Sequence, residues 1–182
     1  MVVKVAIEWK WINLHPADTW SVIEGKLSIA GVNLKQISRS VYVIRAADSF
    51  AIKYPIKYSP TLYIGEGRFK QRITSHRKWL SAIYGLAGEF NLEVAICVPR
   101  VRHNEQAYKD FEAHLLSVFS KRYGSLPLQN KNHEHTKFGH SYERIATTAV
   151  LGPGKGKKYQ WALEPLKANP FFKTYIKTHR AS

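Results

Sequence analysis

Apolar and polar side chains alternate over the first residues of the chain. Residues 3–11 carry an apolar side chain at every second position, ending in Trp9 and Trp11. This period is typical of a half-buried strand, so we expect both tryptophans to face the core, with stacking on unpaired bases as the alternative. A His-Pro-Ala-Asp sequence predicts a short helix over residues 15–23 that stops at Gly25, and residues 26–34 predict another short strand.

Two stronger strand patterns lie in the middle of the chain. Residues 41–44 and 61–64 are short runs of β-branched and aromatic side chains, and the second run ends at Gly65. Residues 46–60, between them, carry several tyrosines and prolines. We interpret this intervening segment as an irregular insertion.

Helical spacing begins after Gly65. An apolar stripe predicts a helix over residues 68–84, and residues 91–98 predict a strand. Asn104 is a suitable cap for a further helix, which ends at Gly124. The order strand, strand, helix, strand, helix predicts an α/β or α+β fold.

The pattern weakens after Gly124. Residues 126–140 are polar and rich in histidine, whereas residues 145–151 are apolar enough for a late strand. A loop of glycines and lysines follows at residues 152–158, and residues 171–177 predict a last short helix. Neither a repeat nor a clear linker interrupts the 182 residues, which predicts one compact domain.

Charge gives the first indication of function. Lysine and arginine number 28 against 13 acidic residues, for a net charge of +15 and a pI near 9.9. A polyanionic partner would relieve this self-repulsion, and basic side chains displace counterions from phosphates. Nucleic acid is therefore favoured over an anionic membrane surface, for which the sequence offers no basic amphipathic helix.

The single cysteine, Cys97, lies in an apolar run and predicts a buried, inert thiol. One cysteine cannot form an internal disulfide, which suits a reducing compartment. No stretch approaches the roughly 20 apolar residues of a membrane-spanning helix, and the first residues carry no signal-peptide core. We therefore expect a soluble, cytoplasmic protein.

Candidate chemistry begins where the strand of residues 61–64 ends. A glycine turn follows Tyr63, and Arg72 and His76 then lie four positions apart, on one face of the predicted helix. A guanidinium can grip a phosphate with its planar fork, and an imidazole can position or donate a proton nearby. The pair would address one point in front of Tyr63, although each residue alone also fits an ordinary surface or boundary position.

Glu112 is a second candidate. Its neighbours at helical spacing are Leu115, Leu116 and Phe119, so its carboxylate borders the apolar stripe, where a charge needs a partner. A hard divalent cation is one such partner, and a basic side chain is the other. The residues alone leave both open.

Taken in order, these motifs resemble those of the GIY-YIG nucleases. The matching residues are Val41-Tyr42, Tyr63-Ile64-Gly65, Arg72 with His76, Glu112, and an asparagine after Leu126-Pro127-Leu128. The resemblance covers residues 40–132 as a catalytic core, between an N-terminal extension (1–39) and a basic C-terminal region (133–182). It implies a small, mainly antiparallel sheet flanked by helices, and hydrolysis of double-stranded DNA with Mg²⁺, or Mn²⁺, as cofactor.

The resemblance also implies a role for each matched residue. Tyr42 and Tyr63 would activate or orient the attacking water. Arg72 would hold the scissile phosphate and offset its developing charge, with His76 as a helper. Glu112 would hold a single Mg²⁺, which polarises the phosphate and stabilises the leaving oxygen.

The first motif departs from the family pattern. Ser40 stands where the family has glycine, and the two tyrosines are 21 positions apart (63 minus 42), so the linking hairpin must carry an insertion. We assign the first tyrosine to Tyr42 rather than to Tyr54 or Tyr58, because Tyr42 alone lies in a convincing strand.

Residues 126–140 hold two further candidates. The late asparagine of the family falls on Asn130, which would buttress the site, with Asn132 as the other choice. The run His133-Glu134-His135, with His140, could form a metal cluster. The absence of a cysteine partner and the loop-like flanks favour a solvated or DNA-contacting loop instead.

Further basic residues are candidates for DNA contact. They are Arg68 and Lys70 at the start of the predicted helix, and Lys155, Lys157 and Lys158 in the glycine-rich loop. That loop lacks the pattern of a P-loop, so we interpret it as a flexible clamp on the DNA backbone, with simple solvation as the alternative.

The sequence thus predicts an endonuclease, and its small size favours a restriction-type enzyme, for which a homodimer would allow both strands to be cut. A non-specific, mobile-element or repair nuclease of the same family is the nearest alternative. The alternative from another class is a nucleic-acid-binding module without catalysis, in which the tyrosines and Glu112 are structural.

Overall fold

The computed structural model describes residues 4–46, 50–86, 91–135, 139–152 and 161–163. At its centre is a four-stranded sheet in the order β2-β7-β3-β6, and each neighbouring pair is antiparallel. These strands are β2 (Lys10–Leu14), β3 (Val41–Ala46), β6 (Thr61–Glu66) and β7 (Leu92–Cys97). The fold is α+β with a mainly antiparallel sheet, as the sequence predicts.

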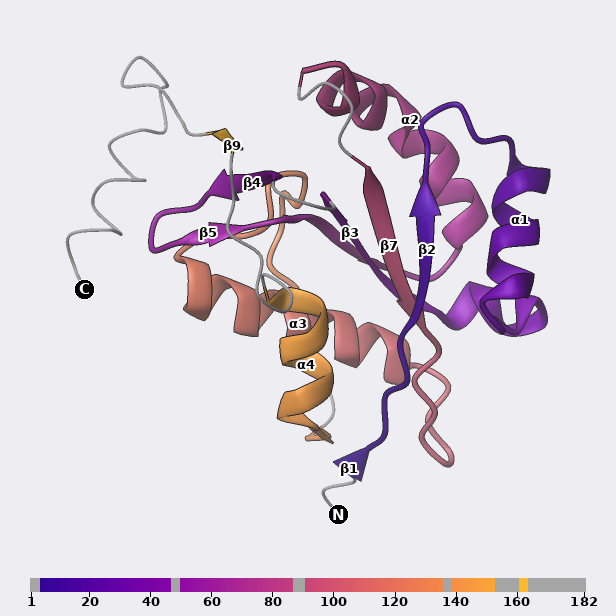
Figure 1. The fold of residues 1–182 in the computed structure, drawn as a ribbon. Helices are drawn as coiled ribbons and strands as arrows, with labels where there is room; N and C mark the ends of the chain where they lie inside the picture. Colours follow the sequence, from indigo (N-terminus) through magenta and orange to yellow (C-terminus); the bar gives the residue numbers. More distant parts are fainter. Residues whose placement is uncertain (1–3, 47–49, 87–90, 136–138, 153–160, 164–182) are drawn as a thin grey trace.

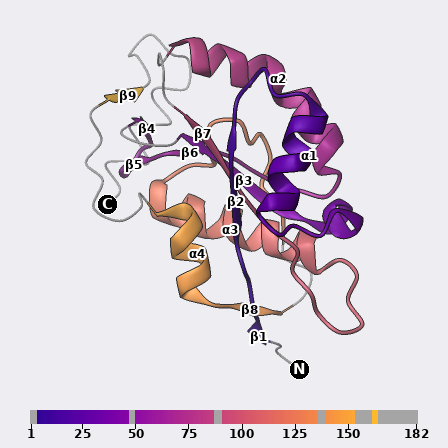
Figure 2. The same cartoon turned by 45° about the vertical axis from the view of Figure 1, so that its right-hand side comes forward.

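Helices cover both faces of this sheet. α1 (Trp20–Ile29) and α2 (Phe69–Leu86) lie on one side, and α3 (Ala107–Tyr123) and α4 (Arg144–Leu151) lie on the other (Figures 1 and 2). Every residue of β3 is buried, as expected for an apolar strand that is covered on both faces.

The N-terminal extension is part of this core. β2 forms one edge of the central sheet, and Ile12, Leu14, Ile23 and Leu27 belong to the same apolar cluster as the residues of β3 and β6. A short 3₁₀ helix, η1 (Leu34–Arg39), then leads directly into β3. Cys97 is buried in the same cluster, as expected.

Two small sheets flank the main one. β1 (Lys4–Val5) pairs in parallel with β8 (Ser141–Tyr142), while β4 (Phe50–Lys53) lies between β5 (Tyr58–Ser59) and β9 (Trp161–Leu163). The irregular insertion predicted for residues 46–60 is therefore wrong, since it contains two paired strands. Tyr54 anchors it, because its buried ring packs on Phe119 with centroids 5.0 Å apart.

The single strand predicted over residues 3–11 is also wrong. The segment contains β1 and the start of β2, and the buried positions of β2 are Ile12 and Leu14. The buried positions are odd-numbered in β1 and even-numbered in β2. A shift of one residue in this alternation moves each side chain to the other face of the sheet. Trp11 is consequently 40% exposed, beneath the Arg45 guanidinium at 5.4 Å, whereas Trp9 packs against the core as expected.

The helix end predicted at Gly25 and the strand predicted for residues 26–34 are wrong for the same reason. Gly25 does not end a helix, because α1 begins after its Thr19 cap and passes through Gly25 to Ile29. Residues 26–34, predicted as a strand, form the second half of α1 and its turn, where Gly31 has a φ of 75°. Burial of Ile23 and Leu27, four positions apart, outweighs the low helix propensity of glycine.

The predicted strand of residues 145–151 is the helix α4. Ala146, Val150 and Leu151 are buried at helical spacing, and the Thr147 hydroxyl donates to the Glu143 carbonyl one turn earlier. A short apolar run of this kind does not separate a strand from a buried helix. The helix predicted at residues 171–177 lies outside the described residues.

The strongest patterns are confirmed. The strands around Tyr42, Tyr63 and Val94 and the helix after Gly65 all form within a few residues of the predicted bounds. α3 ends at Gly124, whose φ of 84° suits glycine, but its N-cap position is Gln106 rather than Asn104. Among the helices that the structure describes, none is long and apolar enough to cross a bilayer.

Candidate active site

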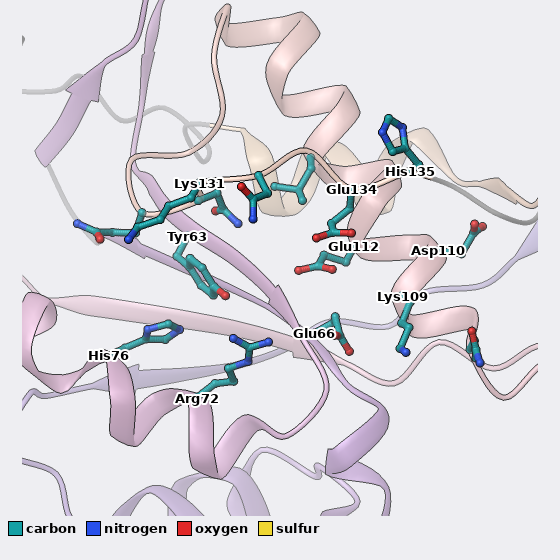
Figure 3. Close-up of a pocket in the computed structure, with 15 residues that line it drawn as sticks. Tyr63, Glu66, Arg72, His76, Lys109, Asp110, Glu112, Lys131, Glu134 and His135 are labelled. Atoms are coloured by element: carbon teal, nitrogen blue, oxygen red, sulfur yellow. The ribbon is translucent and has the colours of Figure 1, made fainter. Parts of the chain in front are cut away.

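A cavity of about 510 Å³ opens beside β6, an edge strand of the central sheet. Its walls come from β6, α2, α3 and the segment 129–135 (Figure 3). Most of the predicted catalytic residues lie on these walls: Tyr63, Arg72, His76, Glu112 and Asn130. We call this space the site cavity.

The position of β6 at the edge explains how the site cavity is built. Tyr63 pairs with Ile44 across the sheet and faces α2, which supplies Arg72 and His76. Side chains alternate along a strand, so Glu66 lies on the opposite face, toward α3 and Glu112. None of the described strands pairs with this edge of the four-stranded sheet, so residues from both faces meet around it.

On the α2 side, Tyr63 and His76 are in contact, with ring centroids 4.5 Å apart. Burial, and secondarily the Arg72 guanidinium, lowers the pKa of His76 to about 4, so its imidazole is neutral at neutral pH. The His76 Nε2 atom is buried and has no hydrogen-bond partner among the described residues. This buried nitrogen is therefore unsatisfied within the part of the chain that the structure describes.

Tyr42 does not reach the site cavity. Its side chain has no exposed surface and lies behind Tyr63, with ring centroids 6.0 Å apart. Burial raises the pKa of both phenols above the ordinary value of 10.0, so both are neutral at neutral pH. Tyr63, which is only half-buried, is the tyrosine that the structure offers to a ligand.

On the α3 side, the carboxyl groups of Glu112 and Glu134 lie side by side, and Glu66 is near enough for its charge to act on Glu112. Burial, followed by the charges of Glu66 and Glu134, raises the pKa of Glu112 to about 8, and Arg72 opposes this only in part. Within the described residues Glu112 makes no ion pair. The basic partner that the sequence left open is therefore not found there. A pKa of about 8 leaves Glu112 mostly protonated at neutral pH, and a nearby cation would favour its ionised form.

Several residues of the site cavity escape the sequence analysis, among them Glu66, Lys109 and Lys131. Burial raises the pKa of the Glu66 carboxyl, and the nearby charges of Lys109 and Arg72 counteract this. Lys109 precedes Glu112 by one helical turn, a spacing that could have identified it. Nothing in the sequence pattern points to Lys131.

Asn130 holds the outer edge of β6. Its side-chain amide donates to the Ile64 carbonyl at 2.7 Å, and its side-chain oxygen accepts from the Ile64 N–H at 2.9 Å. The Gln129 N–H adds a bond to the Leu62 carbonyl at 3.0 Å. These contacts satisfy backbone groups that an edge strand leaves open. Asn132 also lines the site cavity, but it is exposed and does not hold the strand.

Glu112, with Glu66 and Glu134 nearby, offers carboxylate oxygens of the kind that a hard cation takes. Within the described ranges, no group of three or more His, Cys, Asp or Glu side chains is arranged to hold a metal ion. Mg²⁺ needs only one or two carboxylates, with water and phosphate oxygens completing its shell. The suggested histidine cluster does not form there, since His140 lies against the Asn104 amide at 2.9 Å.

Of the predicted DNA-contacting residues, the structure describes two, and neither lines the site cavity. Arg68 and Lys70 are exposed at the start of α2 but line a different hollow, and Lys70 lies 5.2 Å above the Trp20 ring. Lys155, Lys157 and Lys158 lie outside the described residues. The chain matches no protein-family model, no curated protein and no solved structure.

Proposed function

We propose that this protein is a Mg²⁺-dependent endonuclease of the GIY-YIG type that hydrolyses phosphodiester bonds in double-stranded DNA. The observation that carries the proposal is the site cavity itself. There an arginine, a neutral histidine and a tyrosine stand on one wall, and the Glu112 carboxyl, which makes no ion pair with any described residue, stands on the other. Hydrolysis of a phosphodiester needs groups of both kinds. Positive charge must offset the charge on the phosphate oxygens, and a water must be oriented toward the phosphorus.

Arg72 binds the scissile phosphate in this mechanism. Its side chain is exposed on the first turns of α2 and lines the site cavity, so the guanidinium can form two parallel bonds to phosphate oxygens. Its charge then offsets the negative charge that grows on these oxygens as the water attacks.

Tyr63 and His76 prepare the water. The Tyr63 phenol stays protonated, so it orients the water by hydrogen bonding rather than acting as a phenolate. As the water oxygen bonds to phosphorus, a water proton leaves to solvent, and the neutral ring of His76 holds Tyr63 in position. The bond to the leaving oxygen breaks in the same displacement, and that oxygen takes a proton from solvent.

Glu112 would hold the magnesium ion, with Glu66 and Glu134 close enough to strengthen the local negative potential. When bound there, the ion supplies charge that polarises the phosphate and stabilises the leaving oxygen. A cation in this position also removes the cost of three neighbouring carboxylates, since an opposite charge nearby favours the ionised form.

The test is digestion of supercoiled plasmid by wild type, Glu112→Gln and the control Glu24→Gln, each with Mg²⁺ or with EDTA. Glu24 is an exposed carboxylate on α1, outside the site cavity. We expect wild type and Glu24→Gln to cut only with Mg²⁺, and Glu112→Gln to lose cutting by at least about 100-fold while still binding DNA. Unchanged cutting by Glu112→Gln would remove this residue from the mechanism.

The pattern of DNA products also distinguishes the subclass of nuclease. Discrete fragments favour a restriction-type enzyme, and a smear favours a non-specific nuclease. A nucleic-acid-binding module without catalysis is the second candidate, and the net charge of +15 supports it equally well. Binding without cutting under any divalent metal would favour that second candidate.

A further inference from the structure

A second hollow, of about 480 Å³, lies between η1 and the loop that joins β7 to α3. Its cationic side chains are Lys35, Arg39 and Arg100, against the single carboxylate of Glu105. His103 lies at the same place, and the catalytic mechanism uses none of these residues. We call this hollow the basic cleft.

Most of the positive charge in the basic cleft is not neutralised. Arg39 is paired with Glu105 at 3.3 Å, which uses the one carboxylate. Arg100 bonds the neutral side chain of Gln36, and Lys35 makes no ion pair with any described residue. Two exposed cations thus remain beside a concave surface, where an anion would be attracted.

The loop that forms one wall is a defined turn. The Asn104 N–H donates to the Val101 carbonyl at 3.1 Å, and the Asn104 side-chain oxygen accepts from the Gln106 N–H at 2.9 Å. His103 occupies this turn with a φ of 58°, in the left-handed region that side chains rarely adopt. The turn leaves both His103 and the preceding Arg102 exposed.

The basic cleft adjoins the site cavity. Glu105 lines the cleft and Gln106, the next residue, lines the cavity. On the opposite side, the Gly67 N–H donates to the Ser40 carbonyl at 2.8 Å, which joins the turn after Glu66 to the end of η1. The residues just before α3 therefore lie between the two hollows. A ligand long enough to enter both would meet Arg72 in the cavity and Lys35 and Arg100 in the cleft.

We propose that the basic cleft binds backbone phosphates of the same DNA that enters the site cavity, on one side of the phosphate to be cut. The choice of DNA as the polyanion rests on the proposed function. Lys35 and Arg100 contact these phosphates directly, and His103 adds a ring donor at the rim. The cleft positions the duplex and carries no step of the reaction.

The test compares the double variant Lys35→Gln/Arg100→Gln with the charge-matched control Lys57→Gln/Lys121→Gln. All four side chains are exposed, and the control pair lies near Tyr123, at the far end of α3 from the basic cleft. Equal melting temperatures check that each variant folds. His103→Asn is an additional variant, because asparagine tolerates the left-handed backbone.

Binding is measured in EDTA on a labelled duplex over a range of salt concentrations. We expect the cleft double variant to bind roughly tenfold more weakly at moderate salt, with the slope of log K against log salt smaller by about 1.8, the value for two lost phosphate contacts. The control should change both quantities much less. In Mg²⁺, the cleft variant should show a raised KM and a nearly unchanged kcat.

The two proposals fail in different ways. An unchanged DNA affinity and salt slope in the cleft double variant would overturn the basic cleft, whether or not the wild type cuts DNA. A cleft double variant that no longer binds inorganic phosphate but still binds DNA as the wild type does would also overturn it. If the protein never cuts DNA but its DNA affinity depends on Lys35 and Arg100, the proposal for the basic cleft stands and the nuclease proposal fails.

Discussion

Gly65 lies between two aromatic side chains that occupy the space of its missing Cβ. A Cβ at this position would lie 2.5 Å from Cε1 of Tyr63 and 2.8 Å from the Tyr42 hydroxyl. Both rings are held by neighbours, since Tyr42 packs on Phe69 and Tyr63 packs on His76. A larger residue at position 65 would therefore displace Tyr63, the tyrosine that lines the site cavity.

We accordingly expect Gly65→Ala to lose about 1–3 kcal/mol of stability through overpacking, and to lose DNA cleavage disproportionately. Gly25→Ala is the matched control, because nothing lies within 4 Å of its Cβ position and the residue is inside α1. That change should stabilise the protein by about 0.5–1 kcal/mol. Urea denaturation and plasmid digestion measure the two effects, and equal behaviour of both variants would contradict this account.

His76 gives a pH dependence of known sign. Its pKa is about 4 in the folded protein, below the ordinary 6.5 expected of the unfolded chain. Between these values the unfolded chain takes up a proton that the folded state does not. The stability linked to His76 is thus fully present above pH 6.5 and declines as the pH falls toward 4.

The variant His76→Gln should lack this decline. We expect the stability of wild type relative to His76→Gln to fall by at most about 1.4 kcal/mol for each pH unit across this window. His133→Gln, at an exposed position, is the control for a histidine without such burial. Urea titrations at a series of pH values measure the difference, and a constant difference between wild type and His76→Gln would contradict the burial of a neutral imidazole.

At the scale of elements, the outer edge of β6 is held by a segment that is distant in the sequence. The nitrogen and the oxygen of the Asn130 side-chain amide bond the carbonyl and the N–H of Ile64, respectively. Asn130→Asp keeps an acceptor for the Ile64 N–H but places a second acceptor against its carbonyl. We expect it to cost about 1–3 kcal/mol and to speed hydrogen exchange at the Ile64 amide, whereas Asn132→Ala should do neither.

Strong local signals explain which elements could be predicted. The β-branched and aromatic runs at Tyr42 and Tyr63 and the long apolar stripe after Gly65 agree with their surroundings, and all three formed as predicted. The errors occur where packing overrides local preference. Gly25 lies inside a helix because Ile23 and Leu27 are buried beside it, and the β-branched run of α4 is helical because Ala146 and Val150 share one buried face.

At the scale of the whole molecule, the site cavity combines residues of two kinds. Arg72 and His76 could be predicted, because a single helical repeat places them on one face. The grouping of Glu66 and Glu134 with Glu112 could not be predicted, because it arises only when α3 and the segment after Asn130 close around the edge of β6. Sequence spacing carries no information about such long-range closure.

On the proposed function, the described part of the chain contributes one site cavity, with Arg72 on its walls to bind a phosphate. One such site holds one scissile phosphate, so cutting both strands of a duplex requires either two successive events or two copies of the chain acting together. We expect supercoiled plasmid to pass through a nicked circle before it becomes linear. At higher protein concentration the linear form should gain at the expense of the nicked circle.

An excess of Glu112→Gln over wild type separates these two routes. If two copies act together, mixed pairs cut one strand only, so nicked circles should accumulate while linear product falls. If single copies act independently, the excess should slow both steps alike through competition for DNA. Linear product that forms without a nicked intermediate, even at the lowest protein concentration, would contradict a single-strand cut per site and would require a preformed dimer with both cavities engaged.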